Sequence, residues 1–469
     1  MDAERVCWLS VAELAPLLQR REVSPVELLE AYLARTDRLE PELNCYVSQL
    51  RGEARMAARS AEHEIMRGNY RGPLHGVPVA LKDLFDLAGC RTTASSKVLA
   101  DNVAKNDSTV AKKLKAAGAV IVGKTNTHEF AFGGTTDSAY FGATHNPWDT
   151  SRVPGGSSGD SAAAVAASLC TAALGSDTGG SIRLPAAFCG IVGLKPTYGR
   201  VSLSGVVPLA WSMDHAGPLT RSAADAALLL AAIAGHDPAD PTTADLPVPD
   251  YPRAVQRSPK GLRLGVPRGY FFEDVDAEVE AAVRSAVAVL AGLGIAIEEV
   301  SLPRAAYGRD MFNVVVHSEA AAHHEPWLLE RPQDYGADVR ARLEAGRMAR
   351  AVDYLRAQRA RGLLREDFVR AFQRVDAIAT PTIPTVATTI GAGTVTVNGR
   401  QADLRAILGR FTSPINMTGL PAISVPCGFA HGLPVGLQLV GRAFEEETIL
   451  ALAHAYEGAT TWHERRPPV

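Results

Sequence analysis

Amphipathic helices and short apolar strands alternate along most of the chain, and this alternation restricts the possible folds more than any other feature. The segment STVAKKLKAAG (108–118) predicts a helix that ends at Gly118, and the AVIVG that follows it predicts a buried strand. The same order recurs at 276–302 and at 364–384. Alternating helices and strands are typical of an α/β domain in which helices cover a sheet.

The pattern extends toward both ends of the chain. SVAE at Ser10–Glu13 and SPVE at Ser24–Glu27 match the capping box that begins a helix, and each precedes an amphipathic run. Between residues 422 and 458, AISVPCG and LPVGLQLVG predict strands and EEETILALAHAYEG predicts a helix. We expect 235–260 and 385–402 to form surface loops.

Charge and cysteine content indicate the partners and the compartment. With 48 basic and 51 acidic residues the net charge is −3, so we predict no nucleic-acid partner and no membrane partner. The N-terminus lacks a signal-peptide pattern, and no stretch of about 18 apolar residues suggests a membrane span. The cysteines form no C-x-x-C pair, which favours buried thiols in a reducing compartment, and we predict a cytoplasmic protein. They are Cys7, Cys45, Cys90, Cys170, Cys189 and Cys427.

Two short motifs suggest chemistry that their surroundings do not support. GAVIVGKT at Gly118–Thr125 matches the phosphate-binding G-x-x-x-x-G-K-T pattern, but its apolar interior is typical of a buried strand. GGSSG at Gly155–Gly159 matches the G-x-S-x-G nucleophile elbow, which must follow a strand. The polar residues and Pro154 before it favour a loop.

Two further clusters are interpreted as structural. An arginine-rich segment, 338–370, alternates its arginines with acidic and apolar residues, which favours a solvated helical surface over a nucleic-acid face. A group of histidines and glutamates near residue 320 has no H-E-x-x-H spacing, so we expect no metal there. The group consists of His317, Glu319, His323, His324 and Glu325.

The stretch GSDTGGSIR combines a potential nucleophile with unhindered backbone. Gly179 and Gly180 carry no side chain, so their N–H groups could stabilise an oxyanion beside the Ser181 hydroxyl. Lys82, at the end of the apolar run VPVALK, could act as a base if burial lowers its pKa. On these local features alone, the catalytic interpretation is no better supported than a structural one, in which Lys82 reaches solvent and the glycines only form a turn.

Longer segments carry a resemblance. GVPVALKDLFDLAGCRTTASS, PGGSSGDSAAAVAA and GSDTGGSIRLPAAFCGIVGLKPTYGRVS resemble the three core segments of the amidase signature family, and Ser157 and Ser181 are 24 positions apart, as in that family. GKTNTHEFAFGG, NPWDTSRVP, DHAGPLTRS and GLPVGLQLVG extend the likeness over nearly the whole chain. The resemblance implies one α/β domain over 1–469, with a mixed, mostly parallel β-sheet between layers of α-helices. Its parts would be a helical N-terminal part (1–65), a catalytic core segment (66–230), and variable helices with C-terminal strands (231–469).

The resemblance also implies a Ser–cis-Ser–Lys triad. Matched by position, Ser181 would be the nucleophile, Ser157 the bridging serine on a cis peptide bond, and Lys82 the base. The acyl-enzyme would form on Ser181 without a cofactor or a metal. The oxyanion hole would comprise the N–H groups of Thr178, Gly179, Gly180 and Ser181.

Other matched positions would support the site. Ser158 would be a hydrogen-bond partner of Lys82, and Asp177 and Arg183 would hold the nucleophile loop without reacting. The segment Ala131, Phe132, Gly133 and Gly134 would line the acyl pocket, although Phe132 suits a plain core position equally well. Asp160 departs from the family, which has glycine there, and we expect it to cap the following helix.

Two branches of the family compete for the function. One is the glutaminase component of the tRNA-dependent amidotransferase, which releases ammonia for a partner subunit. That branch usually has glutamine where this chain has Leu184, and an acid where it has Gly409 and Arg410. We therefore expect a stand-alone amidase, with some esterase activity, that acts on a small apolar acyl amide, anilide or carbamate. A homodimer is possible, and an inactive scaffold is disfavoured because all three triad residues are present.

Overall fold

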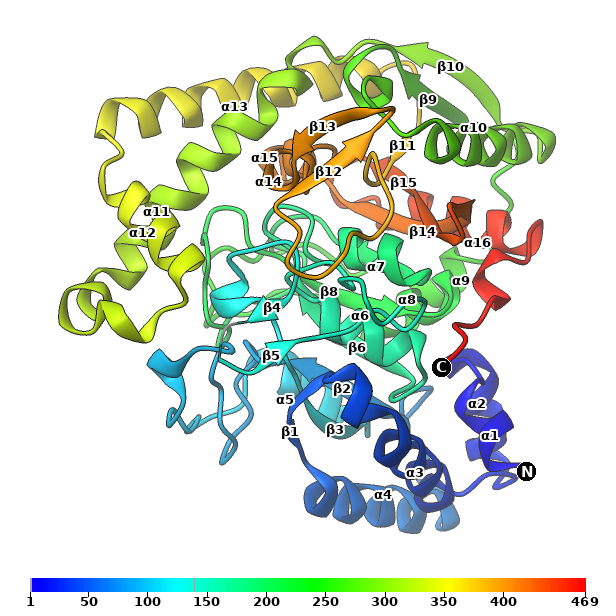
Figure 1. Cartoon of the computed structure of the whole chain (residues 1–469). Helices are drawn as coiled ribbons and strands as arrows, with labels where there is room; N and C mark the ends of the chain where they lie inside the picture. The colour runs from blue at the N-terminus through cyan, green and yellow to red at the C-terminus, as the bar shows by residue number, and fades with distance from the viewer. Residues whose placement is uncertain (1, 139) are drawn as a thin grey trace.

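Eleven strands form one mixed sheet in the order β1-β3-β2-β6-β8-β7-β14-β15-β11-β9-β10 (Figure 1). The computed structural model describes residues 2–138 and 140–469. The strands of the sheet are β1 (Tyr46–Gln49), β2 (Pro78–Lys82), β3 (Val120–Thr125), β6 (Ala172–Ser176), β7 (Val192–Lys195), β8 (Ala216–Thr220), β9 (Arg263–Pro267), β10 (Ala296–Val300), β11 (Ala377–Pro381), β14 (Ala422–Ala430) and β15 (Leu433–Gly441). Two small hairpins lie outside it: β4 (Asp137–Ser138) with β5 (Gly142–Ala143), and β12 (Thr394–Val397) with β13 (Arg400–Asp403).

Parallel pairing is confined to two blocks of the sheet. Strand β2 runs parallel to β3 and β6, and β9 runs parallel to β10 and β11. The remaining neighbours are antiparallel, including the hairpin of β14 and β15, whose tight turn contains His431 and Gly432. In the parallel block the carboxyl ends of β2 and β6 meet at one edge, the usual place for a ligand site in an α/β sheet.

Helices cover both faces of the sheet. An added Cβ at Gly436 of β15 would meet Ala187, whereas one at Gly441 of the same strand would meet Ile449. Positions an odd number of residues apart point to opposite faces, so the helices that carry Ala187 and Ile449 lie on opposite sides. The helices are α1 (Ala3–Cys7), α2 (Val11–Gln19), α3 (Pro25–Leu43), α4 (Arg51–Met66), α5 (Thr109–Ala116), α6 (Gly159–Ala166), α7 (Arg183–Cys189), α8 (Ala223–Ile233), α9 (Tyr251–Ala254), α10 (Ala277–Gly292), α11 (Gly308–Glu330), α12 (Ala337–Arg347), α13 (Ala351–Phe372), α14 (Leu404–Ile407), α15 (Ser413–Thr418) and α16 (Glu446–Gly458). The α/β sheet between helical layers is confirmed.

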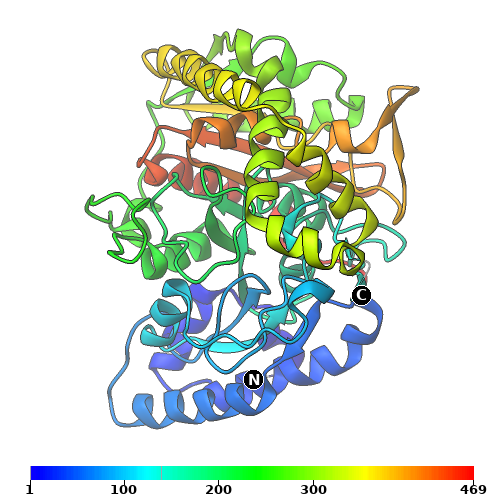
Figure 2. The ribbon, with the colours of Figure 1, turned by 90° about the vertical axis from the view of Figure 1, so that its left-hand side faces the viewer.

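Helices α11, α12 and α13 pack together at one side of the molecule (Figure 2). The arginine-rich segment 338–370 lies in α12 and α13, as expected for a helical surface. Among the described residues, no helix is both long enough and apolar enough to span a membrane.

Short sequence patterns correctly predicted the start of several helices and the position of a buried strand. Ser10 and Glu13 form the reciprocal capping box of α2, while Ser24 accepts from the N–H groups of Val26 and Glu27 at the start of α3. The segment Gly118–Thr125, which matches the phosphate-binding pattern, contains strand β3. Its Lys124 forms a fully buried ion pair of 2.8 Å with Asp83. The prediction of a surface loop over 385–402 was wrong in part. The β-branched residues of β12 pair there with β13 and form a hairpin.

Candidate active site

Lys82 is the last residue of β2 and is completely buried. Its Nζ lies 2.6 Å from Ser157 Oγ, 2.9 Å from Ser158 Oγ and 2.9 Å from Ser176 Oγ. Ser176 ends the parallel neighbour β6, so the sheet itself brings these two side chains together. The sequence did not single out Ser176, although it directly precedes the acid of the GSDTGGSIR motif.

Burial shifts the titration of this lysine. Removal from water lowers the pKa of Lys82 to about 7, and the more distant charges of Asp160, Asp177 and Asp214 oppose that change. Within the described part of the chain, no carboxylate contacts Nζ, and its three contacts are neutral hydroxyls. A large fraction of the amine is therefore neutral near pH 7, which allows it to accept a proton.

The loop before α6 presents Ser157 and Ser158 to the lysine. The Gly156–Ser157 peptide bond is cis, and the Ser157 carbonyl accepts from Thr127 Oγ1 at 2.9 Å. The Ser158 N–H donates to the Ser181 carbonyl at 3.2 Å, which joins this loop to the second serine loop. Ser157 is fully buried, whereas Ser181 is partly exposed and lines a cavity.

Asp177 organises the loop that carries Ser181. Its carboxylate accepts from the backbone N–H groups of Gly180, at 2.8 Å, and Ile182, at 3.1 Å. It also accepts from Arg183 Nε at 3.0 Å and Nη2 at 2.9 Å. Burial disfavours the charged carboxylate, but the Arg183 guanidinium outweighs this effect and holds the pKa of Asp177 well below its usual range.

These bonds modify the predicted oxyanion hole. The N–H of Gly180 is already bonded to Asp177, so it is not free for a substrate. The N–H groups of Gly179 and Ser181 have no acceptor among the described residues. An added Cβ at Gly179 would lie 2.5 Å from Phe312 Cζ, which explains why this position needs glycine.

Arg183→Met should destabilise the fold by about 3–5 kcal/mol, because it leaves Asp177 buried without its cation. Urea unfolding followed by circular dichroism measures the change. Arg350→Met is the matched control, since its pair with Asp353 is at the surface and is worth at most about 1 kcal/mol. Equal losses in both variants would contradict a structural role for the buried pair.

A cavity of about 1050 Å³ opens in front of Ser181. All four oxyanion-hole candidates and all four acyl-pocket candidates line it, and so does Leu184. These residues are Thr178, Gly179, Gly180, Ser181, Ala131, Phe132, Gly133 and Gly134. The structure therefore places the two predicted groups, which are far apart in sequence, around one space.

Charged side chains also line this cavity, which the sequence did not reveal. Arg342 of α12 pairs with Asp338 at 3.3 Å and lies over the Phe132 ring, 5.5 Å from its centroid. Asp338 also contacts His128 Nε2 at 3.1 Å. Arg309 of α11 reaches the same cavity. These cations are distant from the serine motifs in sequence, so no local pattern connects them to the site.

Asp160 behaves differently from the expected helix cap. It lies in the first turn of α6, but Oδ1 accepts from Thr144 Oγ1, while Ser158 is the N-cap residue. Burial raises the pKa of Asp160 well above its usual range.

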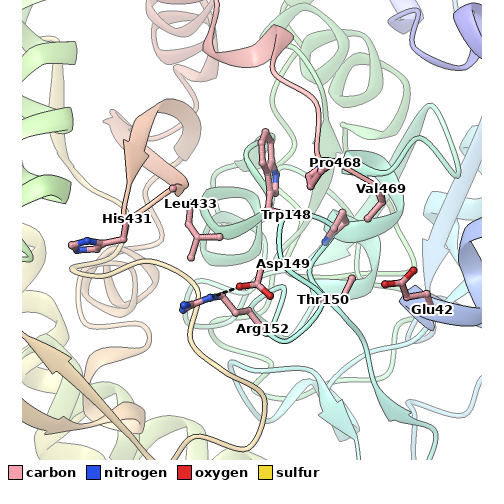
Figure 3. A pocket seen from close by; sticks show the side chains of 11 residues that line it. Glu42, Trp148, Asp149, Thr150, Arg152, His431, Leu433, Pro468 and Val469 are labelled. Atoms are coloured by element: carbon pink, nitrogen blue, oxygen red, sulfur yellow. Dashed lines mark hydrogen bonds and ion pairs between the residues drawn. The ribbon is translucent and has the colours of Figure 1, made fainter.

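The histidine group near residue 320 contributes one residue to this cavity, and a second cavity lies apart from it. His317 lines the cavity, but the described residues contain no group of three His, Cys, Asp or Glu side chains that could hold a metal ion. A second cavity, of about 450 Å³, has polar walls that include the Asp149–Arg152 ion pair of 2.9 Å (Figure 3). It shares no lining residue with the Ser181 cavity.

The residues around Lys82 come from the segments on which the likeness to the amidase signature family rests. The match is much longer than those segments: the Amidase family model covers residues 27–450, and the chain belongs to this family. It is an amidohydrolase, which acts on carbon–nitrogen bonds.

Within the family, the chain is similar to several individual proteins over nearly its full length. The chain is 46% identical to the A component of the glutamyl-tRNA(Gln) amidotransferase of Moorella thermoacetica, over 98% of each protein. It also resembles the crystal structure of the same component from Thermotoga maritima, with 35% identity and a TM-score of 0.79 over 97% of this chain and 94% of that one. A second structure, described as a vestigial protein complex that reveals the evolutionary origins of an s-triazine catabolic enzyme, has 35% identity and a TM-score of 0.92 over 96% of this chain and 98% of that one.

These relatives contradict the prediction of a stand-alone amidase for an apolar amide, anilide or carbamate. They equally contradict partners limited to a small molecule, with no nucleic acid, because several are named as subunits of an enzyme of glutamyl-tRNA(Gln). The prediction relied on Leu184, which stands where that branch has glutamine, and on Gly409 and Arg410, which stand where it has an acid. Those positions do not describe the whole cavity, because charged side chains from other segments, among them α11 and α12, also line it.

Proposed function

We propose that this chain is the amide-hydrolysing subunit of a cytoplasmic tRNA-dependent amidotransferase. It hydrolyses the carboxamide of a small amide donor, glutamine in the branch that it resembles, and supplies the ammonia to a partner subunit that amidates glutamyl-tRNA(Gln). The full-length match at 46% identity carries this choice within the family. Arginines in the Ser181 cavity support it, because guanidinium groups bind carboxylates and an apolar acyl chain needs none.

In the proposed acylation, Ser181 is the nucleophile. Neutral Lys82 accepts a proton from Ser157, and Ser157 accepts one from Ser181, whose Oγ forms a bond to the carboxamide carbon. The oxyanion accepts hydrogen bonds from the N–H groups of Gly179 and Ser181. When the tetrahedral intermediate collapses, the carbon–nitrogen bond breaks and Ser157 gives a proton to the nitrogen, so that ammonia leaves. Ser157 regains a proton from the Lys82 ammonium group, which leaves Lys82 neutral for the next step.

Deacylation uses the same groups in reverse. A water molecule gives its proton through the serine relay to Lys82 and attacks the ester on Ser181. The carboxylic acid is released, and Ser181 recovers its proton. Ser158 and Ser176 hold the amine of Lys82 toward Ser157 throughout, because each is 2.9 Å from Nζ.

Reconstitution tests the proposed partner. This chain replaces its homologue in the Moorella thermoacetica amidotransferase, and formation of glutaminyl-tRNA from glutamyl-tRNA(Gln) is measured with glutamine or with ammonium chloride. We expect the wild-type chain to support both reactions. The Ser181→Ala complex should use ammonium but not glutamine, because only the amide-hydrolysing step is lost.

A complex that amidates tRNA with ammonium but never with a donor amide, although the chain alone hydrolyses uncharged amides, would contradict the proposal. An inactive complex with ammonium means that this chain does not replace its homologue, and assembly with the remaining subunits is then measured by size-exclusion chromatography. A chain that binds none of them would contradict the proposed partner.

A further inference from the structure

Arg309 is a cation of the Ser181 cavity that has no acidic partner among the described residues. Its Nη1 donates to Ser413 Oγ at 3.1 Å and its Nη2 donates to the Arg405 carbonyl at 2.6 Å. Its Nε is buried and has no hydrogen-bond partner in the described part of the chain. Arg342, by contrast, pairs with Asp338. A partly buried charge without a counter-ion is unfavourable, so an anion is the ligand that this position favours.

The position of Arg309 relative to Ser181 follows from Gly409. An added Cβ at Gly409 would lie 2.7 Å from Arg309 Nη1 and 3.1 Å from the Gly179 carbonyl. A side chain at 409 and the guanidinium therefore compete for the same space beside the nucleophile loop. Ser413 links the two, because its hydroxyl also lies 3.2 Å from the Gly179 carbonyl.

None of the acids that line the cavity is paired with Arg309 among the described residues. Asp137 and Asp338 contact the two ring nitrogens of His128. Asp403 is exposed and accepts from the Arg405 N–H at 2.7 Å. Asp310 is exposed, and its charge raises the pKa of the neighbouring Arg309 without forming an ion pair with it. None of these carboxylates forms an ion pair with Arg309, which keeps its charge because burial lowers its pKa only to about 10.

The geometry points to Arg309 as a specificity-determining residue that selects, among amide donors, ω-carboxamides that carry a carboxylate and no α-ammonium group. Glutaramate, which is glutamine without its amino group, represents this class. The inference rests on the proposed function in one respect: the site hydrolyses a small donor amide that has a carboxylate. A guanidinium attracts that carboxylate and repels an ammonium group beside it.

Equilibrium binding to the Ser181→Ala protein tests the inference without turnover. Titration calorimetry is performed with glutaramate, L-glutamine and butyramide, which share the amide end and differ in charge. We expect glutaramate to bind about 10-fold or more tightly than glutamine, and butyramide to bind most weakly. Adding Arg309→Met should weaken glutaramate by about 10- to 100-fold, as expected for a charge-assisted hydrogen bond, and should abolish the preference over glutamine.

Two further variants distinguish ligand selection by Arg309 from a general folding defect. Arg309→Lys keeps the cation and should keep the order of preference, even if Arg309→Met does not fold. Arg350→Met, which changes an exposed arginine just before α13, should leave all three affinities unchanged.

The failures are distinguishable. If the Ser181→Ala protein with Arg309 unchanged binds glutamine as tightly as glutaramate, the inference is wrong and the proposed function stands. If neither carboxylate-bearing amide binds more tightly than butyramide, the site does not recognise a carboxylate, and both the inference and the proposed donor are wrong.

Discussion

Ser181→Ala should abolish covalent labelling by a fluorophosphonate and lower kcat for amide hydrolysis by about 10⁴-fold or more, as loss of a catalytic serine does elsewhere. The physical reason is that Ser181 combines access to the cavity with adjacent free N–H groups, whereas Ser157 is fully buried. Labelling is measured by fluorescence after electrophoresis, and turnover by ammonia release. Ser258→Ala, at an exposed loop serine, is the matched control and should retain both.

The opposite result would favour the other serine motif. Labelling that survives in Ser181→Ala but disappears in Ser157→Ala would make Gly155–Gly159 a nucleophile elbow after all. In our account Ser157→Ala still presents Ser181 to the probe but loses the proton relay, so it should reduce amide turnover strongly.

Lys82 should make kcat/KM rise with pH and level off on the alkaline side, with a midpoint near the pKa of about 7 that burial gives this lysine. The base must be neutral, so acid removes the active form and alkali does not. An exposed lysine with a pKa of about 10.4 would be neutral in fewer than about one molecule in a thousand at pH 7. The profile is measured with an uncharged amide, to keep substrate titration out of it.

Substitutions at Lys82 separate a base from a structural cation. Lys82→Ala should remove the acidic limb and most of the rate. Lys82→Arg should not restore activity, because a guanidinium stays charged at any useful pH. A Lys82→Arg enzyme that hydrolyses amides near the wild-type rate would contradict the neutral-base role. Lys260→Arg, at an exposed lysine, serves as the control for the substitution itself.

Sequence patterns predicted the elements that local chemistry determines. The capping box of α2, the buried strand β3 and the loop character of residues 155–158 follow from side chains within a few residues of each other. The placement of Lys82 at the end of β2 also followed from its apolar run. These features depend on short-range periodicity, which a single sequence displays directly.

The charge of the donor pocket could not be predicted in the same way. Arg309 and Arg342 enter the cavity from α11 and α12, and only the packing of these helices brings them to Ser181. The Gly180 N–H could not be assigned from the motif either. It was expected to be free for a substrate, but it donates to the Asp177 carboxylate. Asp160 likewise finds Thr144, 16 residues earlier, instead of the helix terminus beside it.

The acyl-enzyme itself is the most direct test of the account. The protein is mixed with glutamine or glutaramate, quenched in acid within the first turnover, digested and analysed by mass spectrometry. We predict an acyl adduct on the peptide that contains Ser181, absent from Ser181→Ala and slow to hydrolyse in Lys82→Ala when an activated ester supplies the acyl group. An adduct on Ser157, or turnover with no adduct on Ser181 under any quench time, would contradict the assignment of the nucleophile.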